Sequence, residues 1–145
     1  MSQENVDLVR EGFARWNQGD YDFFLNLTAP DVELLSRFGS LTGEPYRGHR
    51  GVREWLADIQ QSFERFELWL DDLRDLGDDV LAIGGIKLRA RGSGLDMKEP
   101  MGWLFELRDG RVARMRFYAQ PAQALEAVGL SETDIPRGEE PEPRA

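Results

Sequence analysis

The sequence contains no cysteine and a single histidine, and these two shortages narrow what the protein can do. Without cysteine the chain forms no disulfide, offers no thiolate nucleophile and cannot hold zinc through sulfur. Because His49 is the only histidine, a multi-histidine metal site within one chain is also excluded. We therefore expect neither a metal ion nor a cofactor.

Long apolar runs and an excess of positive charge are also missing. The longest apolar-looking run, VLAIGGI, is far shorter than the ~20 residues that span a bilayer. The first residues have neither the basic nor the apolar region of a signal peptide. A net charge of −9 repels nucleic-acid backbones and anionic membranes. We expect a cytoplasmic protein that binds neither nucleic acid nor membrane.

What the sequence does contain is a run of strand-like segments between residues 80 and 120. Residues 80–91, 101–107 and 112–118 predict three consecutive antiparallel strands. Asp109-Gly110 predicts a tight hairpin turn, because such a turn needs positive φ at both central residues. We expect one domain over residues 1–130, followed by a mobile, Pro- and Glu-rich acidic tail over residues 131–145.

The chain before these strands is predicted to be mostly helical. Apolar residues repeat at helical spacing in a first helix and again in a third helix that begins near His49, with a short helix, YDFFLNL, between them. The two apolar stripes are Val6, Val9, Phe13 and Trp16, and Val52, Trp55, Leu56, Ile59 and Phe63.

The remaining elements are shorter and are read from local signals. VELLSRF predicts a first strand, and SLTGEPYRGHRG predicts a loop. FELWLDDLRDL predicts a strand with a bulge at Asp71-Asp72, where the alternation is disturbed. A last helix is expected from Pro121 to Gly129.

Alternation with period two gives the predicted sheet one apolar face and one cationic face. The apolar face, which we expect beneath the helices, carries Ala82, Gly84, Ile86, Leu88, Ala90, Met101, Trp103, Phe105, Leu107, Ala113, Met115, Phe117 and Ala119. The cationic face carries Lys87, Arg89, Arg91, Leu104, Arg114, Arg116 and Tyr118. That face is either solvated and balanced by neighbouring acids, or a homodimer surface rich in Arg and Tyr.

Three segments together resemble the SnoaL-like branch of the nuclear transport factor 2-like superfamily. They are WNQGDYDFFLNLTAPDVEL, EPYRGHRGVREWL and FELRDGRVARMRFYAQPAQALEAVGL, and the resemblance covers roughly residues 4–130. It implies an α+β, cystatin-like fold, in which a strongly curved antiparallel sheet wraps the N-terminal helices as a cone with a deep pocket. It also implies homodimers through the outer sheet face. The activities it implies include ketosteroid isomerisation, polyketide aldol cyclisation, epoxide hydrolysis and dehydration, besides binding without chemistry.

The superfamily's enzymes resemble each other in using a carboxylate in an apolar pocket, where desolvation shifts its pKa toward neutrality. This chain departs from that pattern, because only Glu33 precedes the end of the first strand and the last strand has no acid. Gln120 stands near the place of a carboxylate, and an amide cannot transfer a proton. His49 is the candidate catalytic residue, because histidine is the side-chain type best suited to acid–base chemistry at neutral pH. Its alternative is a helix N-terminal residue that is exposed or bonded to backbone.

The inner aromatic side chains are the candidate ligand-binding groups; the alternative is that they are plain core. The predicted site consists of Trp16, Arg37, Tyr46, Trp55, Trp103, Phe105, Phe117 and Gln120, with Arg37 and Gln120 as its polar groups.

Three functional hypotheses follow. The first is a small-molecule-binding protein with an apolar or aromatic ligand. The second is an isomerase, cyclase or hydratase-like enzyme that uses His49 or an unrecognised carboxylate. The third is a dimeric accessory protein without ligand, favoured by a filled pocket and a wide apolar outer sheet. If no cavity larger than a few water molecules exists, the first two hypotheses both fail.

Overall fold

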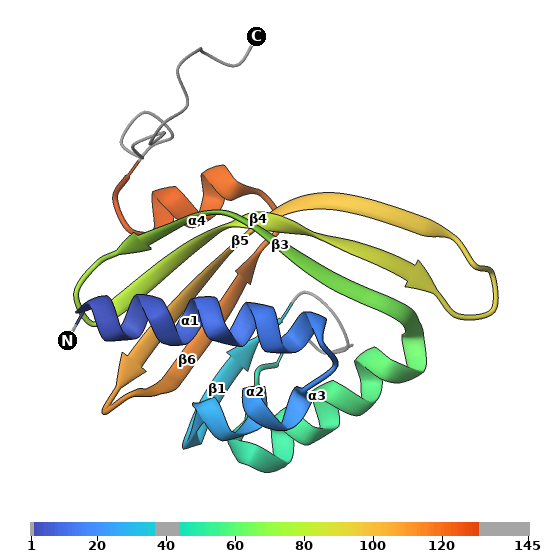
Figure 1. Ribbon diagram of the computed structural model, residues 1–145, viewed down its shortest axis with the longest axis horizontal. Coiled ribbons are helices and arrows are strands. Elements are labelled where there is room, and N and C mark those ends of the chain that lie inside the picture. Colours follow the sequence, from blue (N-terminus) through green and yellow to red (C-terminus); the bar gives the residue numbers. More distant parts are fainter. Residues whose placement is uncertain (1, 37–43, 131–145) are drawn as a thin grey trace, which may run out of the picture.

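Residues 2–36 and 44–130, which the computed structural model describes, form a curved six-stranded sheet with three helices inside its curve and one outside (Figure 1). The helices are α1 (Ser2–Asn17), α2 (Tyr21–Leu27), α3 (Gly48–Ser62) and α4 (Pro121–Ala127). The strands are β1 (Thr28–Leu35), β2 (Tyr46–Arg47), β3 (Phe63–Asp75), β4 (Asp79–Ala90), β5 (Asp96–Arg108) and β6 (Arg111–Tyr118). Arg37 and the tail over residues 131–145 lie outside the described residues. No described helix is both long and apolar enough to cross a membrane.

The sheet confirms the predicted α+β architecture and differs from the prediction in one pairing. Its strand order is β2-β1-β6-β5-β4-β3. Every neighbouring pair is antiparallel except β1 and β6, which run parallel. The predicted antiparallel sheet is therefore confirmed in four of its five described strand pairs, and the pair of β1 with β6 is the exception. A parallel pair needs a long crossover, and here the whole chain between β1 and β6 provides it.

The hairpin between β5 and β6 forms as predicted. Asp109 has a φ of 55° and Gly110 a φ of 75°, the positive values that a tight primed turn requires. A register shift follows the turn, because Leu107 pairs with Val112 and Glu106 pairs with Arg114. Ala113 is the extra residue of this bulge. The fully buried side chain on the inner face is consequently Val112, and not Ala113 as the alternation predicted.

A second bulge confirms the disturbance predicted at Asp71-Asp72. The register of β3 against β4 shifts between Leu70 and Asp72. Gly84 lies opposite, and a Cβ atom built on it would stand 1.9 Å from the carbonyl oxygen of Trp69. The bulge therefore depends on a residue without a side chain.

The N-terminal strands differ from their predicted bounds. β1 begins at Thr28, four residues before the predicted start, because α2 ends at Leu27 and the chain becomes extended at once. Pro30 lies within β1, in the stretch between Thr28 and Glu33 where the pairing with β6 is irregular. The predicted loop contains a two-residue strand, β2, which pairs with Glu33 and Leu34 of β1.

The apolar side chains form two clusters on opposite faces of the sheet. The larger cluster lies on the inner face, beneath α1, α2 and α3. Leu88 and Trp103 are 2% and 1% exposed there, and the half-buried Phe117 packs against the same cluster. The prediction that these three side chains converge beneath the helices is confirmed.

The smaller cluster lies between the sheet and α4. Figure 1 shows that α4 lies on the outer face of the sheet. Leu81, Leu104, Ala124 and Leu125 are its buried members. Gly102 lets the helix approach, because a Cβ atom there would stand 2.5 Å from that of Ala124. Leu104, predicted on an exposed homodimer face, is instead covered by α4. Period-two alternation correctly predicted that Leu104 lies on the outer face of the sheet. It carries no information about which element covers that face.

Candidate functional site

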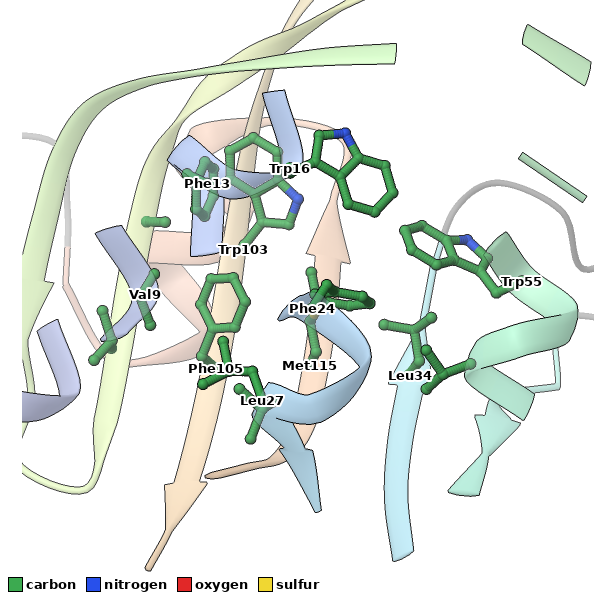
Figure 2. Packing of buried hydrophobic residues seen from close by; sticks show 14 of the residues in the cluster. Val9, Phe13, Trp16, Phe24, Leu27, Leu34, Trp55, Trp103, Phe105 and Met115 are labelled. Carbon is green, nitrogen blue, oxygen red and sulfur yellow. The ribbon is translucent and has the colours of Figure 1, made fainter. Parts of the chain in front are cut away.

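A small apolar cavity lies between the helices and the inner face of the sheet, among the aromatic rings in Figure 2. Its volume is about 30 Å³, which holds roughly two water molecules, since one needs about 10–15 Å³ by the same measure. The lining residues are Val9, Gly12, Phe13, Trp16, Phe24, Leu27, Trp55, Phe66, Leu68, Trp103, Phe105, Met115 and Phe117. The predicted deep pocket is therefore nearly filled by its own side chains.

The periodicities seen in the sequence bring these side chains together. Val9, Phe13 and Trp16 follow the helical spacing of α1 and so point to one side. On the sheet, every second residue of a strand faces inward, which places Trp103 and Phe105 side by side in the wall. Members of this set that sequence reasoning did not assign to the site, such as Phe24 and Met115, carried only the signal of an apolar stripe.

The rings meet mostly at steep angles. The centroids of Phe13 and Trp103 are 5.0 Å apart with an interplanar angle of 88°, and those of Trp103 and Phe117 are 6.2 Å apart at 70°. Trp16 and Trp55 are closer to parallel, 5.5 Å apart at 36°. Edge-to-face contacts of this kind stabilise a fixed arrangement of rings.

Five predicted ligand-binding residues line the cavity: Trp16, Trp55, Trp103, Phe105 and Phe117. Eleven of the thirteen described lining residues are buried, while Leu68 and Phe117 are half-buried. Leu68 and Phe117 are therefore the two described lining residues that are partly exposed to solvent.

Tyr46 and Gln120, also predicted as ligand-binding residues, lie away from the cavity lining. The Tyr46 hydroxyl donates a hydrogen bond to Asp58 Oδ2 at 3.0 Å, and burial together with this bond raises the pKa of Tyr46 to about 12. Gln120 is exposed and caps α4, where its backbone N–H donates to Gln123 Oε1 at 3.2 Å.

His49, the predicted catalytic residue, does not line the cavity either. It is the second residue of α3 and is half-buried. Its Nε2 atom lies 2.9 Å from the carbonyl oxygen of Thr28, the first residue of β1. This contact matches the alternative interpretation, a helix N-terminal histidine bonded to backbone.

No acidic or basic side chain is present among the described lining residues. Glu33, the acid of the first strand, forms ion pairs with Arg47 and, at 3.4 Å, with Arg114. Burial raises the pKa of Asp72, yet this residue lies at the β3 bulge beside Ile83 and outside the lining. The described residues also contain no group of three or more potential metal ligands. None of the described residues that line the cavity therefore carries a side chain suited to proton transfer.

Two indole groups of the lining are tied to the protein framework. Trp16 Nε1 donates to the carbonyl oxygen of Phe66 at 2.8 Å, which fixes α1 to β3. Trp55 Nε1 donates to Ser36 Oγ at 3.0 Å, which fixes α3 to the end of β1. These bonds hold the rings of Trp16 and Trp55 in place against the cavity.

Comparison with known sequences gives one family and several relatives without an assigned role. The family model described as the SnoaL-like domain matches residues 9–115. Uncharacterized proteins of Mycobacterium tuberculosis (strain H37Rv) and Mycobacterium bovis are each 30% identical over 121 residues. The match covers 81% of this chain and 91% of each of theirs.

Comparison with solved structures gives the same fold. A nuclear transport factor 2-like protein of unknown function from Burkholderia pseudomallei has a TM-score of 0.74 at 19% identity, covering 87% of this chain and 98% of that one. TerC, co-crystallized with polyporic acid, has a TM-score of 0.72 at 22% identity, with 85% and 96% covered. A protein provisionally named a SnoaL-like polyketide cyclase, from Jannaschia sp. CCS1, has a TM-score of 0.69 at 22% identity, with 81% and 85% covered.

Proposed function

Because this chain belongs to the SnoaL-like family, we propose that it binds a small apolar or aromatic molecule on the inner face of its sheet. The observation that carries the proposal is the lining of the inner cavity, whose described residues are apolar or glycine and include no charged group. Small-molecule sites are mostly apolar and aromatic. TerC, a solved structure of the same fold, was crystallized with a small organic ligand, polyporic acid, which supports the same use of the fold here.

The cavity is no larger than a few water molecules, so it does not meet the size criterion for a small-molecule site as it stands, and the proposal requires it to enlarge. At about 30 Å³ it cannot hold an aromatic ring, whereas a dry apolar cavity of ~150 Å³ binds benzene. A ligand must therefore displace a lining side chain. The half-buried Leu68 and Phe117 are the residues that can move toward solvent without leaving the core empty. We assign Phe117 as the side chain that closes the site, since its ring is the larger of the two.

An enzymatic function receives less support from the same geometry. Some structural neighbours carry the name polyketide cyclase, which would favour chemistry in this cavity. The lining nevertheless has no acid or base among the described residues, and His49 is engaged at Thr28 outside it. Binding without proton transfer is the function that these side chains support best.

The nearly filled cavity favours a second candidate, a dimeric accessory protein without ligand. Its outer face, however, is not the wide apolar surface that such a role would use, because α4 covers Leu81 and Leu104. The part of the outer face beside α4 carries ion-paired arginine, with Arg114 near both Glu33 and Glu106. We propose that this charged part of the outer face is the contact between two copies of the chain. The dimer contact then exists alongside the ligand site and does not replace it.

Truncation of Phe117 tests the ligand proposal. In Phe117→Ala the closing ring is removed, so we expect toluene to bind at least several-fold more tightly than to the wild-type protein. Leu70→Ala is the matched control, because Leu70 is a half-buried member of the same core outside the cavity lining. Binding is measured by the toluene-dependent rise in Tm, which follows from preferential binding to the folded state.

Methyl NMR distinguishes the two candidate functions. Toluene bound in the cavity should shift the methyl signals of Met115 and Leu27, and leave the methyls of Leu125 beneath α4 unchanged. If neither the wild-type protein nor Phe117→Ala shows shifts at Met115 and Leu27, the ligand proposal is wrong and the accessory function is preferred.

A further inference from the structure

The cavity wall contains one hydrogen-bond donor that the described protein residues leave unused. Three tryptophans line the cavity, and the indole N–H groups of Trp16 and Trp55 donate to Phe66 and Ser36. Trp103 is 1% exposed, and its Nε1 atom forms no hydrogen bond in the described part of the chain. Buried indole N–H groups usually find a partner, so this exception needs a reason.

The position of the Trp103 nitrogen follows from its surroundings. Among the described residues, the side-chain nitrogen and oxygen atoms that are fully enclosed without a hydrogen-bond partner are Asp72 Oδ2, Arg114 Nε and Arg116 Nε. The Trp103 nitrogen is not one of them, so it borders open space. Because the residue is 99% buried and lines the cavity, that space is the cavity itself.

The close-up view agrees with this placement. In Figure 2 the Trp103 nitrogen lies on the edge of the indole ring that faces away from Val9 and Phe13. This edge faces the side on which Phe24 and Trp55 lie. Phe13 meets Trp103 at 88° from the other side, so its ring does not cover the nitrogen. The indole N–H of Trp103 therefore points into the cavity, whose described lining is otherwise apolar.

We infer that Trp103 Nε1–H is the hydrogen-bond donor that orients the ligand, and that the ligand is an apolar, ring-sized molecule bearing one oxygen acceptor such as a ketone carbonyl. This inference rests on the proposed binding function. An indole N–H can only donate, so the complementary ligand atom must be an acceptor. The apolar walls exclude a ligand with several charged or donor groups, since these would be buried without partners.

A matched pair of ligands tests the inference. Acetophenone carries a carbonyl group where α-methylstyrene carries a CH₂ group of similar shape. The quantity measured is the ratio of the Kd of α-methylstyrene to the Kd of acetophenone, obtained by NMR titration of the full chain. We expect Trp103→Phe to lower this ratio roughly threefold to tenfold, the worth of one hydrogen bond. Trp55→Phe should leave the ratio unchanged, because its N–H is bonded to Ser36.

The indole signals of the wild-type protein give a second readout that does not depend on a folded variant. On saturation with acetophenone, the Trp103 N–H signal should move downfield, and α-methylstyrene should not produce this shift. Equal ratios in Trp103→Phe and Trp55→Phe, or a Trp103 signal that responds alike to both ligands, would overturn the inference while leaving the binding function intact. Failure of both ligands to bind would instead overturn the proposed function and the inference with it.

Discussion

The missing side chain of Gly84 determines how closely β3 can approach β4. The carbonyl oxygen of Trp69 occupies the space where a side chain on Gly84 would begin, 1.9 Å from the ideal Cβ position. Real Cβ atoms do not come this close to a carbonyl, so the bulged strand and the glycine form a matched pair. The sequence contains both signals, since Gly84-Gly85 and Asp71-Asp72 interrupt otherwise regular alternation.

Gly84→Ala is expected to destabilise the protein by about 2–3 kcal/mol or more, because backbone of β3 must shift to admit the methyl group. Urea unfolding gives the free energy. Gly12→Ala is the matched control, since a Cβ atom there meets only the flexible tip of Leu27 at 3.3 Å and alanine favours the helix. Equal stability of the two variants would show that β3 does not approach β4 this closely.

Asp79 is placed where its charge opposes folding. Burial, followed by repulsion from Glu106 and Asp78, raises the pKa of Asp79 above its ordinary value of 3.8. A carboxyl group with a raised pKa contributes most stability below that ordinary value and loses the contribution as the pH rises through the raised pKa. At neutral pH the charged Asp79 therefore lowers the stability of the strand pair in which it faces Glu106.

Asp79→Asn should accordingly raise the free energy of unfolding at pH 7 by ~0.2–1 kcal/mol, the worth of relieving a cross-strand like-charge pair. The gain should disappear near pH 3, where the wild-type carboxyl is protonated. Asp96→Asn is the control of opposite sign, because the hydrogen bond from Arg89 lowers the pKa of Asp96. A loss of stability in Asp79→Asn at pH 7 would contradict the assigned repulsion.

At the scale of elements, α4 packs on the outer face of the sheet and forms a second, smaller core with it. Its buried residues, Ala124 and Leu125, are 0% and 2% exposed and rest on Leu81 and Leu104. The helix has only seven residues, too few to be stable without this contact. Its attachment therefore depends on Leu125 and on the close approach that Gly102 permits.

Leu125→Ala should cost about 2–3 kcal/mol and release α4 before the rest of the protein unfolds. Hydrogen exchange is expected to accelerate in residues 121–130 and to stay unchanged in α1. Val128→Ala serves as the control, because Val128 is half-buried at the edge of the same cluster and should have a smaller effect. Uniform acceleration across both helices would show that α4 and the main core unfold together.

The sequence predicted most elements correctly because their signals are local. The stripe of α1, the Asp109-Gly110 turn and the bulge in β3 each need only a few neighbouring residues to be read. The early start of β1, the two-residue β2 and the parallel pairing with β6 depend on contacts between distant segments. The cover of Leu104 by α4 is of the same kind, and period-two alternation carries no information about it.

The predicted residues of the candidate site also fall into two groups, those that line the cavity and those that do not. Trp16, Trp55, Trp103, Phe105 and Phe117 were assigned to the inner wall from periodicity, and they do line the cavity. Tyr46 was assigned to the same inner aromatic set but lies outside the lining and bonds to Asp58. His49 and Gln120 were chosen for their polar chemistry, and they contact Thr28 and Gln123 outside the lining. How completely the rings fill the cavity depends on their rotamers, which the pattern of apolar residues does not specify.

For the whole molecule, the distribution of charge bears on self-association. The chain has a net charge of −9, yet the outer face beside α4 carries Arg114 and Arg116 together with Glu33 and Glu106. A surface with both signs can complement a second copy of itself, because a two-fold axis brings unlike groups opposite each other. The rest of the molecule, being acidic, repels its copies.

We predict that sedimentation equilibrium gives twice the mass of one chain, and that Arg116→Glu shifts the protein toward monomer by placing like charges at the contact. Arg10→Glu, an identical charge change on the exposed side of α1, should leave the dimer intact. A monomeric wild-type protein at concentrations of ~100 μM, well above the Kd of a stable homodimer, would contradict the predicted contact.

The parallel pairing of β1 with β6 has a consequence for how the protein folds during its synthesis on the ribosome. β1 must wait until β6, which ends at Tyr118, has been made before it can join the rest of the sheet. Until then β2 is the one described strand that pairs with β1, although α3 can already pack against β1, and α1 against β3 and β4. We therefore expect the six-stranded sheet to be completed late in synthesis, because β6 joins β1 to the other strands.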